Sequence, residues 1–182
     1  MTTTAYHRPV MLTECLNGLD LQAGGTYVDV TFGGGGHSRA ILERLGAQGR
    51  LIAFDQDPDV QAHLPQDGRF TFVDANFRHL KRFLRLHGAL PVDGILADLG
   101  VSSHQFDEAE RGFSFRFDAE LDMRMDTRSE RTARALLNEA SEEELRRIFR
   151  LYGELTNAGR VAKLVMLARS KGELRTIEQL KA

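Results

Sequence analysis

The sequence predicts an α/β fold in which a parallel β-sheet carries helices on both faces. Three observations point to this class. Strand-like segments alternate with helical ones from residue 9 to residue 100. The strand segments are largely apolar, as strands buried on both faces are. A run of four glycines, 33–36, follows the first strand and opens a helix, which is the arrangement of a βαβ unit.

The expected elements follow in order along the chain. A short helix over 9–17 has Pro9 in its first turn and stops at Gly18. β-branched and aromatic residues dominate 26–32, which we expect to be the first strand. The other three expected strands are 50–57, 69–77 and 92–100, the last of which is apolar from Ile95 to Ala97. Apolar residues at helical spacing predict helices over 38–46 and 77–88.

The pattern changes after Gly100. Residues 101–126 interleave charges with phenylalanines and show little periodicity, so we expect a long ordered loop, often a functional feature. From residue 130 onward the chain is helical, and Ser141 and Thr176 each open a capping-box pattern. These features divide the chain into an α/β core over 1–106, a long functional loop over 107–130 and a helical segment over 131–182.

Composition narrows the class of protein. With 24 basic and 26 acidic residues the net charge is -2, which neither identifies nor excludes a nucleic-acid-binding protein. The single cysteine, Cys15, excludes an internal disulfide, which favours a reducing, cytoplasmic compartment. Its side chain is expected to be buried. We find neither a signal-peptide pattern nor an apolar run of the ~20 residues that cross a membrane. The histidines lack metal-ligand spacing, so no metal site is predicted.

The strand count suggests an incomplete sheet. Only four strands are expected, all before residue 101, whereas doubly wound sheets commonly have two halves. The last capping box is followed by too few residues for a typical helix of about 11. We therefore expect an N-terminal fragment of a longer protein, with an exposed sheet edge through which copies could self-associate. A complete small α/β domain with a helical tail is the alternative.

The glycine run predicts a site where the backbone approaches a ligand, because helix N–H groups point at such a turn. Its place between strand and helix excludes a flexible linker. As the dinucleotide motif GxGxxG the run is incomplete, since Ser38 and Arg39 stand where a third glycine belongs. The spacing Asp29-x-Thr31-x-Gly33 instead favours S-adenosylmethionine, whose cationic groups suit a nearby acid.

Two alternatives stay open at this point. The alternative for Asp29 is a turn or helix-capping acid. Asp55, at the end of the second strand, could accept hydrogen bonds from the ribose of either cofactor, so it does not discriminate between them.

Four motifs in order resemble those of the bacterial small-subunit ribosomal RNA (cytosine-N4)-methyltransferase family. They are HRPVMLTECLNGL (7–19), TFGGGGHS (31–38), FDQDP (54–58) and the long segment DLGVSSHQFDEAERGFSFRFDAELDMRMD (98–126). The sequence departs from the family at Ala119-Glu120, where Gly-Pro is usual, and at 157–159, where a continuous helix is usual. Family members are longer than this chain, and their remaining strands follow an inserted helical domain.

The resemblance implies a class I S-adenosylmethionine-dependent methyltransferase: the N-terminal half of a Rossmann-like parallel sheet, followed by part of the inserted helical domain. The residues that it implies for cofactor binding are Gly35, Gly36, His37, Asp55, Phe77, Asp98 and Gln105, and the glycine spacing adds Gly33. The residues that it implies for the RNA substrate are Ser102, Ser103, His104, Arg111, Phe113 and Phe115. The alternative for this last group is a loop packed by its own phenylalanines.

The implied reaction methylates the exocyclic amine of one cytidine in 16S rRNA, near the decoding centre of the small ribosomal subunit. This amine is a poor nucleophile, so the enzyme must hold it in line with the methyl group, and the base must leave its stack. Asp98 is the catalytic candidate for shaping the amine site, or else it serves only the cofactor. Other hypotheses are a cofactor-binding fragment without activity and a dinucleotide-dependent oxidoreductase. The basic run 78–85 is interpreted as a solvated helix face.

Overall fold

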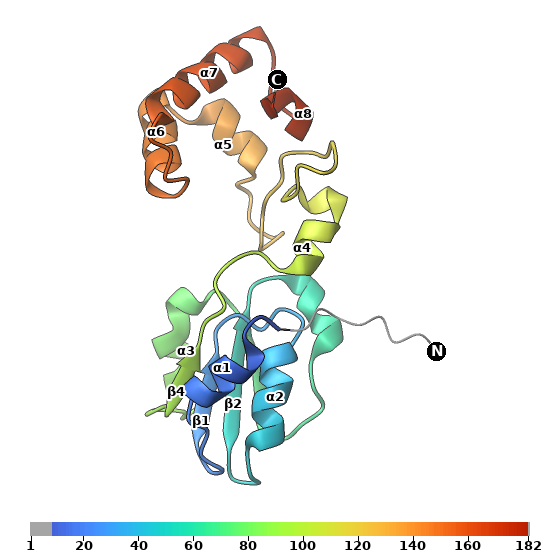
Figure 1. Ribbon diagram of the computed structural model, residues 1–182, viewed down its shortest axis with the longest axis vertical. Helices are drawn as coiled ribbons and strands as arrows, with labels where there is room; N and C mark the ends of the chain where they lie inside the picture. Colours follow the sequence, from blue (N-terminus) through green and yellow to red (C-terminus); the bar gives the residue numbers. More distant parts are fainter. Residues whose placement is uncertain (1–8, 182) are drawn as a thin grey trace, which may run out of the picture. The chain divides into compact units, whose positions relative to one another are not determined.

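The computed structural model describes residues 9–181. His7 and Arg8, with which the first motif begins, lie outside the described residues. The chain forms two compact units that divide between Ser102 and Ser103 (Figure 1). The first unit thus ends shortly before residue 106, where we expect the α/β core to end.

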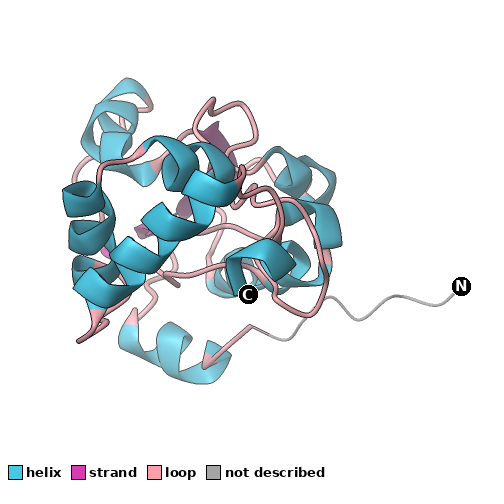
Figure 2. Cartoon of the chain, turned by 90° about the horizontal axis from the view of Figure 1, so that it is seen from above, coloured by secondary structure: helices cyan, strands magenta, loops and turns pink. Residues whose placement is uncertain are grey.

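The first unit is built on a parallel sheet of four strands, in the order β3-β2-β1-β4. The strands are β1 (Thr26–Asp29), β2 (Arg50–Asp55), β3 (Phe70–Asp74) and β4 (Gly94–Leu96). Figure 2 shows the strands in magenta among the cyan helices. Val28 of β1 lies opposite Ile52 of β2 on one side and Ile95 of β4 on the other. The predicted α/β fold with a parallel sheet is confirmed.

Helices cover both faces of this sheet (Figure 1). Helices α1 (Leu12–Gly18) and α2 (Gly36–Arg44) share a buried cluster with Tyr27 and Leu51. Helix α3 (Leu80–Leu86) buries Leu84 in a second cluster, with Val28 and Ile52. Successive residues of a strand face opposite sides, so the two clusters lie on opposite faces of the sheet. Short 3₁₀ turns, η1 (Pro58–His63) and η2 (Phe77–His79), follow β2 and β3.

The bounds of two elements and the burial of one residue differ from the prediction. β1 ends at Asp29 rather than Phe32, because the Asp29 carboxylate accepts the N–H of Thr31 and turns the chain. α1 begins at Leu12 rather than Pro9, since Met11 has a left-handed conformation with φ of 50°. Cys15, expected to be buried, is only half-buried.

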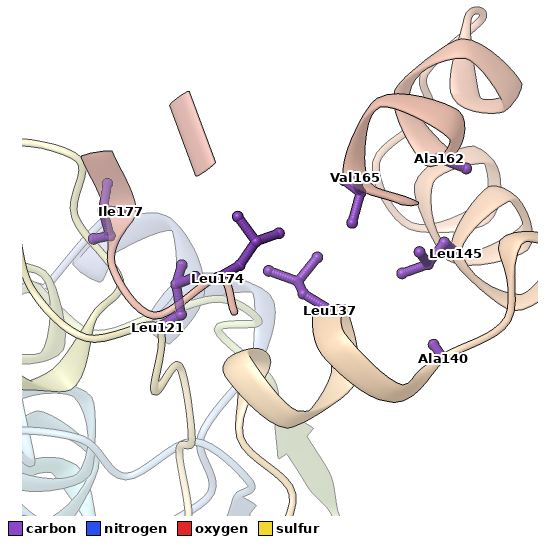
Figure 3. Close-up of a cluster of buried hydrophobic side chains, with 8 residues drawn as sticks. All are labelled: Leu121, Leu137, Ala140, Leu145, Ala162, Val165, Leu174 and Ile177. Carbon is purple, nitrogen blue, oxygen red and sulfur yellow. The ribbon is translucent and has the colours of Figure 1, made fainter. Parts of the chain in front are cut away.

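The second unit is helical. Its elements are α4 (Ser103–Asp107), η3 (Ala109–Arg111), α5 (Ala133–Glu139), α6 (Glu142–Leu151), α7 (Ala158–Lys171) and α8 (Ile177–Lys181). Its core, drawn in Figure 3, consists of Leu121, Leu137, Ala140, Leu145, Ala162, Val165, Leu174 and Ile177. Leu121 comes from the expected loop, and its N–H donates to the carbonyl of Arg175 at 2.9 Å. Part of that loop is therefore held in the core of this unit.

Both predicted capping boxes are present in part. The Ser141 hydroxyl accepts the N–H of Glu144 at 3.1 Å at the start of α6. Gln179 Oε1 accepts the N–H of Thr176 at 3.2 Å at the start of α8. Helix α4 was not predicted, because five residues are too few to show helical periodicity. None of the helices within residues 9–181 has the length and apolar character to traverse a bilayer.

Candidate functional site

The candidate site of the first unit lies where the strand order reverses, at the carboxyl ends of β1 and β4. Open α/β sheets bind ligands at such a switch point. Two hydrogen bonds join the segments that leave these strands. The N–H of Val30 donates to the carbonyl of Leu96 at 3.0 Å, and the N–H of Asp98 donates to Thr31 Oγ1 at 2.8 Å. The two segments are thus fixed side by side.

Asp29, the last residue of β1, is fully buried, with 0% of its surface exposed. Its Oδ2 accepts the Ser38 hydroxyl hydrogen at 2.7 Å, and its Oδ1 accepts the N–H of Thr31 at 3.1 Å. Burial raises the pKa of this carboxyl, and the two hydrogen bonds act in the opposite direction. Asp29 therefore holds the turn and the first turn of α2. Its interpretation as an acid facing a cationic ligand is wrong, because the buried side chain has no open side.

The glycines of the turn differ in what surrounds them. Gly33 and Gly35 have φ of 50° and 73°, in the left-handed region that favours glycine. A Cβ at Gly35 would lie 2.7 Å from the Phe32 ring, and one at Gly36 would collide with the Pro9 ring. Among residues 9–181, a Cβ at Gly33 would meet only the carbonyl oxygen of Thr31, at 4.0 Å. Gly35 and Gly36 thus permit close packing within the protein, whereas Gly33 leaves its side of the backbone open to a ligand.

His37 lies in the first turn of α2 and is buried. Its Nε2 is 3.1 Å from the carbonyl oxygen of Val10, so the ring donates a hydrogen bond to that carbonyl. The ring thereby fastens the segment before α1 to the glycine turn. The first N–H groups of a helix have no acceptor within the helix, so the main chain of His37 is the part suited to a ligand.

Asp55 ends β2 beside the same turn and is half-buried. Its Oδ2 accepts the N–H of Gly33 at 2.8 Å, and its Oδ1 accepts the N–H of Asp57 at 3.0 Å. Burial raises the pKa of this carboxyl, while these N–H groups lower it. Each carboxylate oxygen has a further lone pair, so Asp55 can still accept hydrogen bonds from vicinal hydroxyls.

Two polar residues near Asp55 were missed in the sequence. Asn76 Nδ2 donates to Gln56 Oε1 at 2.8 Å, which links the segments that follow β2 and β3. Asn76 also caps η2 by accepting the N–H of Arg78 at 2.9 Å. This positions the predicted contact residue Phe77, which is 43% exposed. The available signal was that both residues closely follow strand ends, where a parallel sheet gathers polar side chains.

Asp98 follows β4 and is exposed. Its main-chain N–H donates to the hydroxyl of Thr31, a residue that the Asp29-x-Thr31-x-Gly33 spacing includes without assigning it a contact. Its carboxylate makes no hydrogen bond or ion pair with any residue from 9 to 181. Asp98 thus combines a fixed main chain with a carboxylate that is free to meet a ligand.

The remaining predicted residues lie at the end of the first unit or in the second. Ser102 ends the first unit and is half-buried. On α4 of the second unit, Gln105 is buried while Ser103 and His104 are half-buried.

Arg111 and the phenylalanines of the loop have different surroundings. Arg111 is buried, and its Nη2 donates to the carbonyls of Arg124 and Met125 at 3.0 and 3.1 Å. This guanidinium group therefore links two parts of the loop. Phe113 is half-buried, whereas Phe115 is 73% exposed. Phe115 is therefore the more accessible of the two predicted aromatic contacts.

Comparison with known proteins identifies a family. The model of the MraW methylase family matches residues 4–182. A relative from Flavobacterium johnsoniae is 57% identical over 180 residues, covering 99% of this chain and 60% of the relative. One from Bacteroides thetaiotaomicron is 56% identical over 172 residues, covering 94% of this chain and 57% of the relative. Both are named ribosomal RNA small subunit methyltransferase H. The chain thus spans about 60% of the length of these curated relatives.

A solved structure with some likeness is a putative methyltransferase from an antibiotic biosynthesis pathway of Anabaena variabilis. It is 16% identical, has a TM-score of 0.41, and is matched over 82% of this chain and 62% of its own. A likeness of that degree carries no argument about the site.

Proposed function

The chain belongs to the MraW methylase family, and from this premise we propose that its protein methylates the N4 amine of a cytidine in 16S rRNA. The methyl donor is S-adenosylmethionine, the target lies near the decoding centre of the small subunit, and the reaction takes place in the cytoplasm. The observation that carries the proposal is the identity of 53–57% to relatives named ribosomal RNA small subunit methyltransferase H, over almost the whole chain.

The switch-point residues fit S-adenosylmethionine. Gly33 leaves an open side of the backbone, and Asp55 has lone pairs for the two ribose hydroxyls. The exposed Phe77 ring offers an apolar contact for the adenine. Main-chain groups of Gly35, Gly36 and His37 complete the proposed cradle. Gln105, which the resemblance also implies for the cofactor, stays a prediction from the sequence. When bound, the cofactor supplies an electrophilic methyl group.

Asp98 is the proposed catalytic residue. The lone pair of the target amine is delocalised into the ring, so the amine must be oriented before it reacts. A carboxylate that accepts its N–H groups would orient it and draw electron density toward the nitrogen. The exposed carboxylate of Asp98, on a main chain fixed by Thr31, is suited to this role. The same features also suit a contact with the cofactor alone.

The RNA contacts that we propose lie on and after α4. Exposed aromatic rings stack on unpaired bases in many RNA complexes, and Phe115 is suited to this. Ser102, Ser103 and His104 add hydrogen-bonding groups, and the half-buried Phe113 adds an apolar contact. Arg111 would act indirectly, by shaping the loop that presents Phe115.

A methylation assay tests the proposal. Unmethylated small subunits are incubated with S-adenosylmethionine and a longer protein that contains this chain, and their nucleosides are analysed by mass spectrometry. We expect N4-methylcytidine, and a loss on the order of 10²-fold or more in turnover for Asp98→Ala. A methyl group on another atom would contradict the proposed reaction. Turnover by the 182-residue chain itself would exclude the alternative that it only binds the cofactor.

We also propose self-association through the open edge of the sheet. Among the described strands, β4 pairs only with β1, and its Ile95 is 47% exposed. Unpaired parallel edges tend to pair with other chains, and a charged residue on the edge opposes this. Light scattering should show a mass that rises with concentration for the wild type and less for Ile95→Lys. A constant monomer mass for the wild type would refute the association.

A further inference from the structure

A groove on the helical unit lies outside the site described above. It lies between α6 and α7 and has a volume of about 490 Å³. Its lining residues are Glu142, Arg146, Gly159, Arg160, Lys163, Leu164 and Leu167. Three of these are cations, one is an anion and two are leucines, so the groove combines positive charge with an apolar wall.

The helical repeat explains how these residues meet. Arg160, Lys163, Leu164 and Leu167 follow the spacing i, i+3, i+4, i+7, which places them on one face of α7. Arg146 of α6 approaches the start of α7, because a Cβ at Gly159 would lie 3.6 Å from its Cδ. The glycine at 159 therefore keeps this end of the groove free of a side chain.

The cations of the groove have no compensating partners in the structure. The side chains of Arg146, Arg160 and Lys163 form no ion pair or hydrogen bond with any residue in the described range 9–181. Other arginines of the same unit are paired: Arg116 with Asp107, Arg131 with Glu144, and Arg134 and Arg175 with Glu173. With three cations against the single anion Glu142, the lining carries an excess of two positive charges, which makes the groove complementary to an anionic partner.

The leucines narrow the class of partner. Leu164 and Leu167 are 55% and 54% exposed although they line a concavity. In a duplex the bases are stacked and hidden behind the phosphates, so they could not reach an apolar wall. A single strand presents phosphates and unstacked bases at once, which matches cations and leucines on one helix face.

We propose that the α6–α7 groove binds a single-stranded segment of the RNA substrate. Arg146, Arg160 and Lys163 contact phosphates, and Leu164 and Leu167 contact base faces. This inference rests on the proposed function and deepens it, since it gives the helical unit a binding region of its own for the RNA.

Fluorescence anisotropy with a labelled single-stranded RNA 12-mer tests the proposal on the 182-residue chain. The variant R146Q/R160Q/K163Q removes the three cations, and R78Q/K81Q/R82Q removes the same charge from the basic face of η2 and α3. We expect the groove variant to lose about tenfold or more in affinity. Its slope of log affinity against log salt should fall by about 2, since each phosphate contact on a single strand contributes about 0.7. The control should change by less than about twofold in affinity.

Further variants separate charge from shape. R146K/R160K keeps the charges and should retain most of the affinity. L164S/L167S should lower the affinity while leaving the salt slope unchanged, because it removes no phosphate contact. Equal losses in the groove and control variants, or no loss in either, would overturn the inference. Displacement of the RNA by polyglutamate at equal charge concentration would also overturn it, in favour of an acidic protein partner.

Binding of S-adenosylmethionine separates this inference from the proposed function. Calorimetry on the groove variant should give the wild-type affinity for the cofactor, and circular dichroism should give the wild-type helical signal. If these controls hold and RNA affinity is unchanged, the groove inference fails while the proposed function stands. If the groove variant loses RNA affinity but the longer protein makes no N4-methylcytidine, the groove inference stands while the proposed function fails.

Discussion

At the scale of single residues, the buried carboxyl of Asp29 couples stability to pH. Burial raises its pKa above the ordinary value of 3.8. The unfolded chain exposes this group, so at pH values between the two pKa values the folded state binds the proton more strongly. The contribution of the group to the free energy of unfolding is fully present below pH 3.8 and is lost as the pH rises through the folded-state pKa.

The substitution Asp29→Asn should remove this dependence. Asparagine keeps an oxygen for the Thr31 N–H and offers an amide that can donate to the Ser38 hydroxyl. Urea denaturation over a pH series should show that wild type loses stability relative to the variant as the pH rises above 3.8. A stability difference that does not change with pH would contradict this explanation.

The glycines of the turn give a second prediction at this scale. Gly36→Ala should destabilise the protein by about 1–3 kcal/mol, because its Cβ collides with the Pro9 ring. Gly68→Ala is the matched control, since a Cβ there meets no atom of the described residues within 4 Å. It should change the free energy of unfolding by at most about 0.5 kcal/mol. Chemical denaturation measures both, and equal effects would show that Pro9 moves away without cost.

Asp29 and Arg111 show the limit of sequence reasoning for single residues. The spacing places Asp29 beside the glycines, but its 0% exposure depends on Ser38 and the packing of α2. Arg111 looks like an RNA contact in a charged loop, yet its guanidinium group donates to carbonyls of residues 124 and 125. Residue type and spacing indicate which segment of the fold holds a polar side chain. Which way a side chain points is decided by tertiary packing.

At the scale of elements, the start of α6 depends on one hydroxyl. Ser141 Oγ accepts the N–H of Glu144 at 3.1 Å, which satisfies a donor that the helix itself leaves unpaired. Ser141→Ala should lower the free energy of unfolding by about 1 kcal/mol. Ser129→Ala is the control, because its hydroxyl has no hydrogen-bond partner among residues 9–181. Thermal unfolding of the two variants should differ, and coincident midpoints would contradict the capping role.

Strong local signals predicted the elements of this chain, and weak ones did not. The four strands and the capping boxes at Ser141 and Thr176 lie where composition and spacing place them. Helix α4 lacks a repeat long enough to be recognised. β1 ends early because the Asp29 carboxylate accepts the N–H of Thr31. The hydrophobic pattern of the sequence does not show such a hydrogen bond.

At the scale of the whole molecule, the two units have different proposed roles. The sheet unit places Gly33, Asp55 and Asp98 at the switch point, where we propose that they bind the cofactor and orient the amine. The helical unit has a core of its own, built from residues 121–177, and the cationic α6–α7 groove. It begins at Ser103, soon after the strand and glycine pattern of the sequence stops.

The central claim, a site for S-adenosylmethionine at the switch point, is tested most directly by calorimetric titration of the chain with this cofactor. Wild type should bind it, and Asp55→Ala should weaken binding by about 10²-fold, since hydrogen bonds from the ribose to a charged carboxylate are lost. Asp93→Ala is the control. Its Oδ2 also accepts a main-chain N–H, that of Thr26 at 2.7 Å, but Asp93 lies at the amino ends of the strands, away from the proposed site. It should leave the affinity unchanged. An unchanged affinity for Asp55→Ala, or equal losses in both variants, would contradict the claim.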